Sequence, residues 1–364
     1  MIVQDVINHI ENLAPLTYAE DFDNVGLLVG NSKMPITGVL ITLDTLECVV
    51  DEAIDKNCNL IISFHPIIFK GLKSLTGKDY VERTVIKAIK NNIALYAIHT
   101  ALDNSINGVN AIICDTLGLK NKTILIPQKG TIKKLTTYVP LENAQMLRSQ
   151  LFKSGAGNIG NYDNCSFNVE GEGTYRGNEN SNPVIGTKGT LSQEKEIQIS
   201  VTYSKHIESK LLQTLFKEHP YEEVAFETIT LDNFNQNIGM GMIGELEEAI
   251  DSIDFLNYVK QKMNVTCIKH SELSKQTIKK VAVLGGSGSF AIASAKRAGA
   301  DILITADLKY HDFFSAEKKI ILADIGHYES EQFTKNFLVE YLSNKITNFA
   351  IVLSTTNTNP VKYL

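Results

Sequence analysis

Near the C-terminal end of the chain, a histidine and a glutamate follow a mostly apolar segment at a spacing that suits metal binding. The segment 320–325 ends at Gly326, after which His327 and Glu331 stand four residues apart. If the residues after Gly326 form a helix, the two side chains lie on one face, about one turn apart. An imidazole and a carboxylate in that arrangement can share a divalent metal ion.

Two further strand-like segments also end in residues that can bind a metal. His65 directly follows the segment 59–64, and His99 directly follows the segment 93–98, with Asp103 four residues later. In an open α/β sheet, ligands gather at the carboxyl ends of the strands. Nitrogen and oxygen donors without cysteine fit Zn²⁺, Mn²⁺ or Fe²⁺ and disfavour an iron–sulfur cluster. Four or five such donors could hold two metals about 3.5–4 Å apart and convert a bridging water into a hydroxide nucleophile.

Each of these residues also has an ordinary structural explanation. His65 precedes Pro66, which favours a fixed extended turn. Asp103 fits a turn, or the N-cap of a helix that begins near Gly108. A further histidine, His311, follows another predicted strand end and is a candidate for the same cleft. The residues alone leave both explanations open, but three strand ends that carry metal-binding side chains favour a shared site.

A glycine-rich turn at residues 285–289 is a second candidate for ligand binding. Its sequence, Gly-Gly-Ser-Gly-Ser, resembles a turn that cradles phosphate at a helix N-terminus. It has neither the P-loop arrangement nor the dinucleotide-binding fingerprint. We therefore predict a tight strand-to-helix turn.

The elements that must position these residues alternate between short apolar strands and amphipathic helices. We predict strands over 38–44, 59–64, 93–98, 280–284, 301–305 and 319–323, and helices over 46–56, 79–91 and 329–344. Repeated strand–helix–strand units predict an α/β fold with a mostly parallel sheet and helices on its faces.

The middle of the chain has a different character. We predict strands over 134–140, 196–203 and 222–231, helices over 141–153 and 205–217, and edge strands and loops in the Gly- and Asn-rich stretch 155–189. A β-α-β-β-α-β order predicts a small ferredoxin-like α+β domain. We therefore expect a split α/β domain, with halves at 1–128 and 238–364 and an inserted domain at 129–237.

Composition excludes several classes of protein. A chain of 364 residues is too long for one ordinary domain, and 43% apolar residues exclude a disordered protein. The formal charge of -6 argues against a dedicated nucleic-acid binder. Five scattered cysteines indicate reduced thiols, and neither a signal peptide nor an apolar run of about 20 residues is evident. We expect a cytoplasmic protein without a membrane partner.

Four short motifs occur in order in the two α/β halves. They lie at residues 14–16 with 19–30, at 63–69, at 99–103 and at 324–331. Together they resemble the GTP cyclohydrolase 1 type 2 homologue family, also called the Nif-three-like dimetal proteins. The resemblance implies a dinuclear site, usually with two zinc ions, at His65, Asp103, His327 and Glu331, with Glu331 as the bridge. Manganese or iron would suit the same donors.

One position departs from the family pattern. The family commonly has two adjacent histidines where this chain has Phe64 and His65. Phenylalanine cannot bind a metal, so one ion should lose a protein donor, bind more weakly, or recruit His99 or water.

The resemblance also implies an activity and an assembly. It suggests a metal-dependent hydrolase that opens the imidazole ring of GTP or acts on another nucleotide, with His99 or His311 moving protons or binding substrate. The insert, with its motif at 219–226, resembles a PII/CutA-like domain, and the family is similar to toroidal homohexamers built as trimers of dimers. The alternative is a non-catalytic metal-binding regulatory or scaffold assembly, which the insert and Phe64 both favour.

Overall fold

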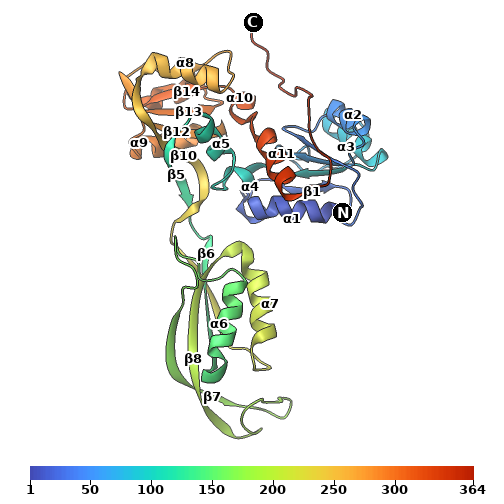
Figure 1. Cartoon of the computed structure of the whole chain (residues 1–364), viewed down its shortest axis with the longest axis vertical. Helices are drawn as coiled ribbons and strands as arrows, with labels where there is room; N and C mark the ends of the chain where they lie inside the picture. Colours follow the sequence, from blue (N-terminus) through green and yellow to red (C-terminus); the bar gives the residue numbers. More distant parts are fainter. The chain divides into compact units, whose positions relative to one another are not determined.

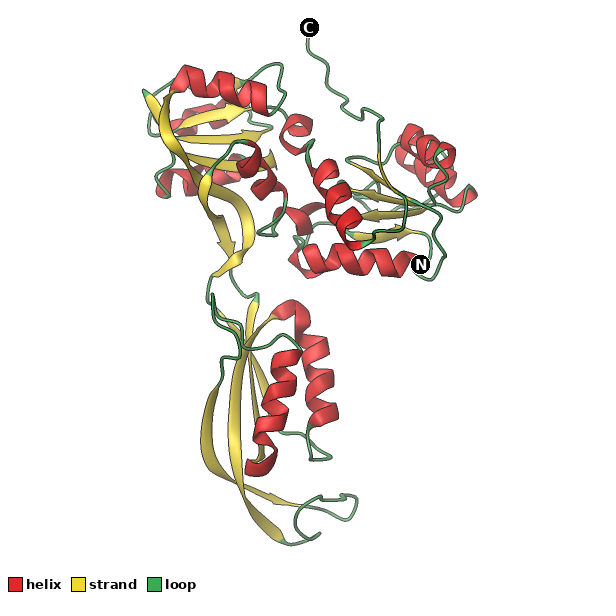
Figure 2. Cartoon of the chain, viewed as in Figure 1, coloured by secondary structure: helices red, strands yellow, loops and turns green.

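The computed structural model describes residues 1–364, which divide into two compact units (Figure 1). The first, which we call the α/β unit, comprises Met1–Pro127 together with Gln236–Leu364, and the second, the inserted unit, comprises Gln128–Asn235. Both units combine helices with strands (Figure 2), and the predicted α/β fold class is confirmed. None of the helices has both the length and the apolar character that a membrane span requires.

The first sheet of the α/β unit has five strands in the order β1-β4-β3-β2-β15. These are β1 (Gly26–Val29), β2 (Val39–Thr42), β3 (Leu60–Ser63), β4 (Ala94–Ala97) and β15 (Ile351–Leu353). The last four named run parallel, and β1 pairs antiparallel with β4 at one edge. The carboxyl ends of β2, β3 and β4 therefore lie side by side.

Helices cover both faces of this sheet because its strands are apolar on both sides (Figure 1). Side chains alternate along each strand, so Leu40, Ile61 and Leu95 share one face and pack with α2 (Glu47–Asp55) and α3 (Tyr80–Lys90). The opposite face packs against α1 (Val3–Leu13) and α11 (Thr334–Lys345), whose buried residues join Ile41, Ile62 and Tyr96 in one cluster.

The second sheet of the same unit has six strands in the order β11-β14-β13-β12-β10-β5. These are β5 (Lys120–Gln128), β10 (Asn235–Asp251), β11 (Lys269–His270), β12 (Thr277–Ser287), β13 (Ile302–Ala306) and β14 (Ile321–Asp324). The three central strands β12, β13 and β14 are parallel. Helices α5 (Val109–Thr116) and α8 (Ser252–Lys262) contribute to the core on one face, and α9 (Ile292–Arg297) to the core on the other.

The predicted parallel strands thus belong to two sheets. Each sheet is built mainly from one half of the chain and contains one strand from the other half. β15 from the C-terminal half completes the first sheet, and β5 from the N-terminal half borders the second. One apolar cluster contains Leu60 and Ile62 of the first sheet together with Val283 and Ile304 of the second. The two halves therefore form a single folded body.

The inserted unit is a four-stranded antiparallel sheet with two helices. Its elements are β6 (Ile132–Pro140), α6 (Ala144–Lys153), β7 (Phe167–Arg176), β8 (Leu191–Ser204), α7 (Glu208–Glu218) and β9 (Phe226–Leu231). The sheet order is β7-β8-β6-β9, and the chain order is the expected β-α-β-β-α-β. Both helices pack on one face of the sheet, over Leu135, Val139 and Ile199 (Figure 1).

Candidate metal centre

Three neighbouring strands of the first sheet each deliver a polar side chain two residues past their last residue. Asp44 follows β2, His65 follows β3 and His99 follows β4 at this interval. The strands are parallel and in register, so these side chains emerge along one edge of the sheet. His99 is also the first residue of a short helix, α4 (His99–Asp103), which ends at Asp103.

The second sheet supplies the remaining candidates from its own strand ends. Asp307 follows β13 directly, and His327 begins α10 (His327–Glu331), a helix of five residues after β14. The predicted helix over 329–344 is therefore two helices, α10 and α11. The expected one-turn stacking is present, because Nε2 of His327 lies 3.4 Å from Oε2 of Glu331.

His65, His327 and Glu331 form one compact cluster. Their donor atoms all lie within 4.8 Å of one another, and Nε2 of His65 lies 3.1 Å from Oε2 of Glu331. Glu331 is almost fully buried, with 3% of its surface exposed. Two histidines and one carboxylate are a donor set found in catalytic zinc sites and in non-haem iron sites.

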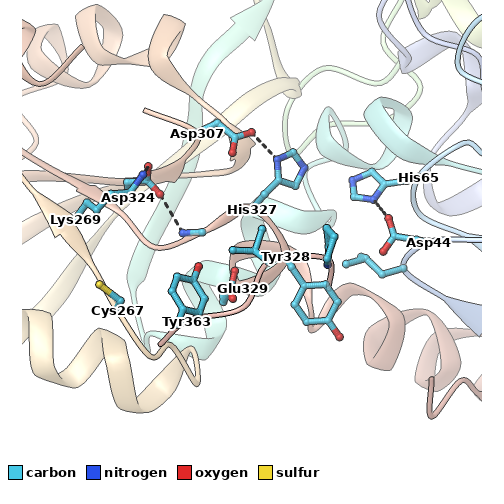
Figure 3. Close-up of a pocket in the computed structure, with 14 residues that line it drawn as sticks. Asp44, His65, Cys267, Lys269, Asp307, Asp324, His327, Tyr328, Glu329 and Tyr363 are labelled. Carbon is cyan, nitrogen blue, oxygen red and sulfur yellow. Dashed lines mark hydrogen bonds and ion pairs between the residues drawn. The ribbon is translucent and has the colours of Figure 1, made fainter. Parts of the chain in front are cut away.

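Each of the three histidines at strand ends has its Nδ1 bound by an aspartate. The Nδ1–Oδ distances are 2.8 Å for His65 with Asp44, 2.7 Å for His327 with Asp307 and 2.8 Å for His99 with Asp23. Figure 3 shows the first two pairs. Such a carboxylate fixes the tautomer and the ring orientation of a metal-binding histidine, because Nδ1 carries the proton and the lone pair of Nε2 is left free to bind a metal.

Sequence analysis missed these three aspartates, although two of them had a visible signal. Asp44 is the last residue of the predicted strand 38–44, and Asp307 follows the predicted strand 301–305 by two residues. Asp23 lies outside any strand or helix, and no comparable signal marks it. All three complete a pattern in which a carboxylate supports each imidazole.

The charges of the cluster favour a cation at its centre. Burial lowers the pKa of His65, but the negative charge of Glu331 and the hydrogen bond to Asp44 outweigh it and raise this pKa to about 10. Burial raises the pKa of Asp23, but hydrogen bonds from His99 and Thr100 outweigh it and bring this pKa to about 2. The cluster therefore attracts positive charge.

Two buried carboxylate oxygens point to a missing positive partner. Oδ1 of Asp103 is buried and accepts no hydrogen bond, and Oε2 of Glu331 is buried with only the Nε2 atoms of His65 and His327 near it, at 3.1 and 3.4 Å. Burial and the nearby charge of Glu331 also raise the pKa of Asp103 well above its usual range. An unsatisfied buried carboxylate oxygen is costly, and a bound cation removes that cost. The donors present therefore fit a divalent metal ion, although Asp103 lies outside the 4.8 Å cluster.

Two cavities give access to this cluster. The larger, about 560 Å³, is lined by His65, His327, Tyr363 and other residues, and Figure 3 shows it. The second, about 260 Å³, reaches Asp103 and Glu331 as well as His99. Open space beside the donors is what a catalytic metal site needs and a purely structural one lacks.

Comparison with known proteins places this architecture in a family. The family model described as Duf34/NIF3 (NGG1p interacting factor 3) matches residues 1–360. The chain belongs to the Duf34/NIF3 family. The predicted resemblance is confirmed, since curated relatives carry the name "GTP cyclohydrolase 1 type 2 homolog".

Relatives of this Duf34/NIF3 protein match it from end to end. The Bacillus subtilis relative is 35% identical over 371 residues, covering 99% of this chain and 98% of the relative. The crystal structure of a Bacillus cereus protein related to NIF3 has a TM-score of 0.86 and 34% identity, and the match covers 100% of this chain and 99% of that one. A Staphylococcus aureus crystal structure has a TM-score of 0.78 and 32% identity over 100% and 99% of the two chains.

Phe64 stands at the position where the family resemblance predicts a second histidine. It is fully buried, and its ring centroid lies 4.9 Å from that of His65 and 5.6 Å from that of His99. The His99 ring is also 5.3 Å from the His65 ring. His99 has a φ of +27°, a conformation that non-glycine residues rarely adopt and that is enriched at functional sites.

The glycine-rich turn makes room for the cluster. A Cβ on Gly286 would lie 2.5 Å from Oε1 of Glu331, and the φ of this glycine is +67°. The N–H groups of Gly285 and Gly286 donate to Asn110 and Ser330, so neither is available to a phosphate. The turn joins β12 to a short 3-10 turn before α9, as the predicted strand-to-helix turn requires.

His311 lies apart from the residues that line these two cavities. It is exposed in a 3-10 segment, Tyr310–Ala316, with its ring 5.2 Å from Tyr310 and 6.1 Å from Phe314. Its role in catalysis stays a prediction.

Proposed function

We propose that this chain is a metal-dependent hydrolase with a dinuclear divalent-metal site that acts on a nucleotide. The observation that carries the proposal is the cluster of His65, His327 and Glu331, whose donor atoms lie within 4.8 Å around a buried carboxylate oxygen. The name shared by the curated relatives supports GTP as the first substrate to test.

Two unequal metal positions follow from the donors. The first would be held by His65, His327 and Glu331, and the second by Asp103 with Glu331 as the bridge. The second has fewer protein donors because Phe64 offers none, so it should bind its ion more weakly. Zinc, manganese and iron all suit these nitrogen and oxygen donors. A divalent cation here supplies Lewis acidity, which lowers the pKa of a water to near neutrality.

His99 is the first candidate for proton transfer. It lines the smaller cavity together with Asp103 and Glu331. Asp23 accepts a hydrogen bond from Nδ1–H of His99, so Nε2 carries the lone pair that can take a proton from a water and later give it to a leaving group. His311 remains the second candidate, and it would have to act on a part of the substrate outside the two cavities.

A nucleotide suits the smaller cavity because aromatic and charged groups line it together. Phe22 and Phe290 line it and are 66% and 55% exposed. A planar base can stack on such rings, with about 1–3 kcal/mol per stacked base in nucleic-acid binding proteins. The carboxylates and histidines beyond the rings would then face the bond that is hydrolysed.

Formate release tests this proposal, because complete hydrolysis of the imidazole ring of GTP consumes two waters: the first opens the ring to a formamide, and the second releases its carbon as formate. The chain is loaded separately with zinc, manganese or iron and incubated with GTP. Glu331→Gln should abolish release, whereas Glu317→Gln, at an exposed carboxylate distant in sequence, should leave it unchanged. Absence of formate with every metal would exclude GTP and redirect the search to other nucleotides and to phosphoesters.

The second candidate is a metal-binding regulatory or scaffold protein without turnover. The separate core of the inserted unit and the missing donor at Phe64 favour it. Glu331→Gln discriminates between the two functions. Loss of assembly or partner binding in this variant, with no hydrolysis detectable in the parent protein, would support the regulatory function.

The proposal includes a homohexamer, a trimer of dimers with a toroidal form, and a cytoplasmic location. The hexamer is carried over from the family resemblance, and the cytoplasmic location rests on the sequence, since five free cysteines fit a reducing compartment. Light scattering at several protein concentrations measures the assembly, and a mass other than six chains would reject the hexamer.

A further inference from the structure

A third cavity, separate from the two beside the metal cluster, lies entirely within the inserted unit and is lined by tyrosine rings. It measures about 380 Å³ and is bounded by Tyr138, Tyr175 and Tyr221, by the loop that follows β7, and by Glu196 on β8. Its volume is in the range of small-molecule sites. Nothing in the hydrolase proposal uses this cavity.

Hydrogen bonds hold the three tyrosine rings in place. The hydroxyl of Tyr175 donates to the carbonyl of Ile185 at 2.8 Å, and that of Tyr221 donates to Oε1 of Glu196 at 2.8 Å. The hydroxyl of Tyr138 lies 3.2 Å from Oε1 of Glu227. The rings of Tyr175 and Tyr221 stand 6.0 Å apart at 58°, so they form a corner of the cavity. A pre-positioned aromatic corner costs a ligand little ordering entropy.

Glu196 is a buried carboxylate without a cationic partner. Only 9% of its surface is exposed, and no lysine, arginine or histidine nitrogen lies within ion-pairing distance of it. Its carboxylate lies directly over Gly173, where any Cβ would overlap with Oε2. Buried charges in proteins are normally paired, because removing a charge from water is costly.

The nearest histidine does not supply the missing charge. Nδ1 of His219 accepts a hydrogen bond from the backbone N–H of Tyr221, and Nε2 donates to the carbonyl of Tyr138. One nitrogen accepts and the other donates, so the imidazole is neutral. The carboxylate of Glu196 therefore faces the cavity without a counter-charge from this side.

The other charged groups at the cavity leave it negative. Glu222 and Glu223 line it together with Glu196, and Arg176 is the single cationic residue that does so. Arg176 forms no ion pair with any of the three. Glu222 is engaged with the backbone N–H of Asn182 at 2.6 Å, which ties the loop to the cavity wall.

We propose that this cavity binds an organic ammonium cation. Tyrosine faces attract alkylammonium groups, by about 0.5–1 kcal/mol when exposed and about 2 kcal/mol when desolvated. The carboxylate of Glu196 supplies the opposite charge beside these faces. An inorganic metal ion holds its hydration shell more tightly than an alkylammonium group does and would gain less from the rings, and an anion would be repelled by the carboxylates.

Choline and its neutral isostere 3,3-dimethyl-1-butanol test the proposal on the full chain, with binding followed by NMR titration. Choline should bind at least about tenfold more tightly than the isostere, because the two differ in charge and not in shape. Glu196→Gln and Tyr175→Leu should each weaken choline binding about tenfold or more. Arg176→Gln should strengthen it, since a like charge is removed.

Two variants outside the cavity serve as controls, and several outcomes would overturn the assignment. Tyr162→Leu and Glu170→Gln, at exposed positions of the same unit, should leave choline binding unchanged. Equal affinity for choline and the isostere, or an unaltered affinity in folded Glu196→Gln protein, would reject an ammonium site. Weaker binding after Arg176→Gln would reject the assigned charge of the cavity. Metal binding and hydrolysis enter none of these measurements, so the result is independent of the proposed function.

Discussion

Replacing Phe64 by histidine tests whether the second metal position is weak because it lacks one donor. Phe64 is fully buried and packs its ring against His65 and His99. The variant Phe64→His supplies the pair of adjacent histidines that the family resemblance predicts. We expect it to be less stable without metal, and to bind a second ion more tightly.

The expected loss of stability follows from the burial of the ring. Truncating a buried phenylalanine to alanine costs about 3–5 kcal/mol, of which an imidazole regains part by filling about half of the space. An unsatisfied buried polar nitrogen adds about 1–3 kcal/mol. With about half of the first cost regained, we expect the metal-free variant to lose about 2.5–5.5 kcal/mol. A metal at roughly 100 times its Kd returns about 2.7 kcal/mol, because it binds only the folded state.

Two measurements check this expectation. Denaturant unfolding in chelator and in excess zinc measures the loss and its recovery, and calorimetric titration with elemental analysis counts the bound ions. Phe255→His is the matched control, since Phe255 is also fully buried but lies in α8. The control should lose a similar free energy, and zinc should not restore it. A Phe64→His variant that zinc does not restore, or that binds no additional ion, would refute the reasoning.

Three other changes have defined outcomes. Asp44→Asn removes the charged acceptor behind one histidine and should weaken metal affinity about 10–100-fold, measured against a competing chelator, whereas the exposed Asp55→Asn should not. Gly286→Ala places a Cβ against Glu331 at a residue with positive φ. We expect the free energy of unfolding to fall by about 1–2 kcal/mol from backbone strain alone, and the metal affinity to be lower in the same titration. Hydrogen bonds from the loop 74–78 bring the pKa of Glu82 in the folded protein to about 2, below its ordinary value of 4.5. Ionised Glu82 therefore stabilises the folded state above pH 4.5, and this contribution to the free energy of unfolding is lost as the pH falls toward 2. Glu82→Gln should therefore be less stable than the parent at pH 7, and denaturant unfolding should show this difference shrinking by about pH 3.

The strand ends that carry the candidate ligands could be found from the sequence, because the rule behind them is local. A short apolar run predicts a buried strand, and parallel strands expose their carboxyl ends along one edge. His65, His99 and His327 each follow such a run within three residues. The same rule applied to aspartates would also have selected Asp44 and Asp307.

Other features depend on contacts between distant parts of the chain and could not be predicted this way. The pairing of Asp23 with His99 joins residues 76 apart, and Asp23 lies in a loop without a periodic pattern. The division of the parallel strands between two sheets depends on which strands pair, and Ile351 pairs beside Val39 although the sequence separates them by most of the chain. Apolar periodicity predicts that a strand is buried, but not which strand is its neighbour.

Asp103 shows how packing decides between two local explanations. From the sequence, it fitted a turn or an N-cap as well as a metal site. In the structure it ends α4, and its Oδ1 is buried without a donor, whereas an N-cap aspartate would accept backbone N–H groups of the next helix. The next helix, α5, begins after Gly108 without a side-chain cap. Asp103 therefore does not serve as its N-cap, and its buried oxygen is consistent with the second metal position that we propose.

The candidate metal centre contains two similar histidine–carboxylate arrangements. His65 belongs to neither of them and makes their surroundings different. Each arrangement is a histidine and a carboxylate four residues apart on a short helix: His99 with Asp103 on α4, and His327 with Glu331 on α10. In each, an aspartate binds Nδ1 of the histidine, and the carboxylate has a buried oxygen. His65 lies 3.1 Å from the carboxylate on α10, so that pair gains a second imidazole. The pair on α4 gains none, because the residue before His65 is a phenylalanine. If two ions bind as we propose, the difference between their affinities should arise at this one position, and not in the fold that carries both pairs.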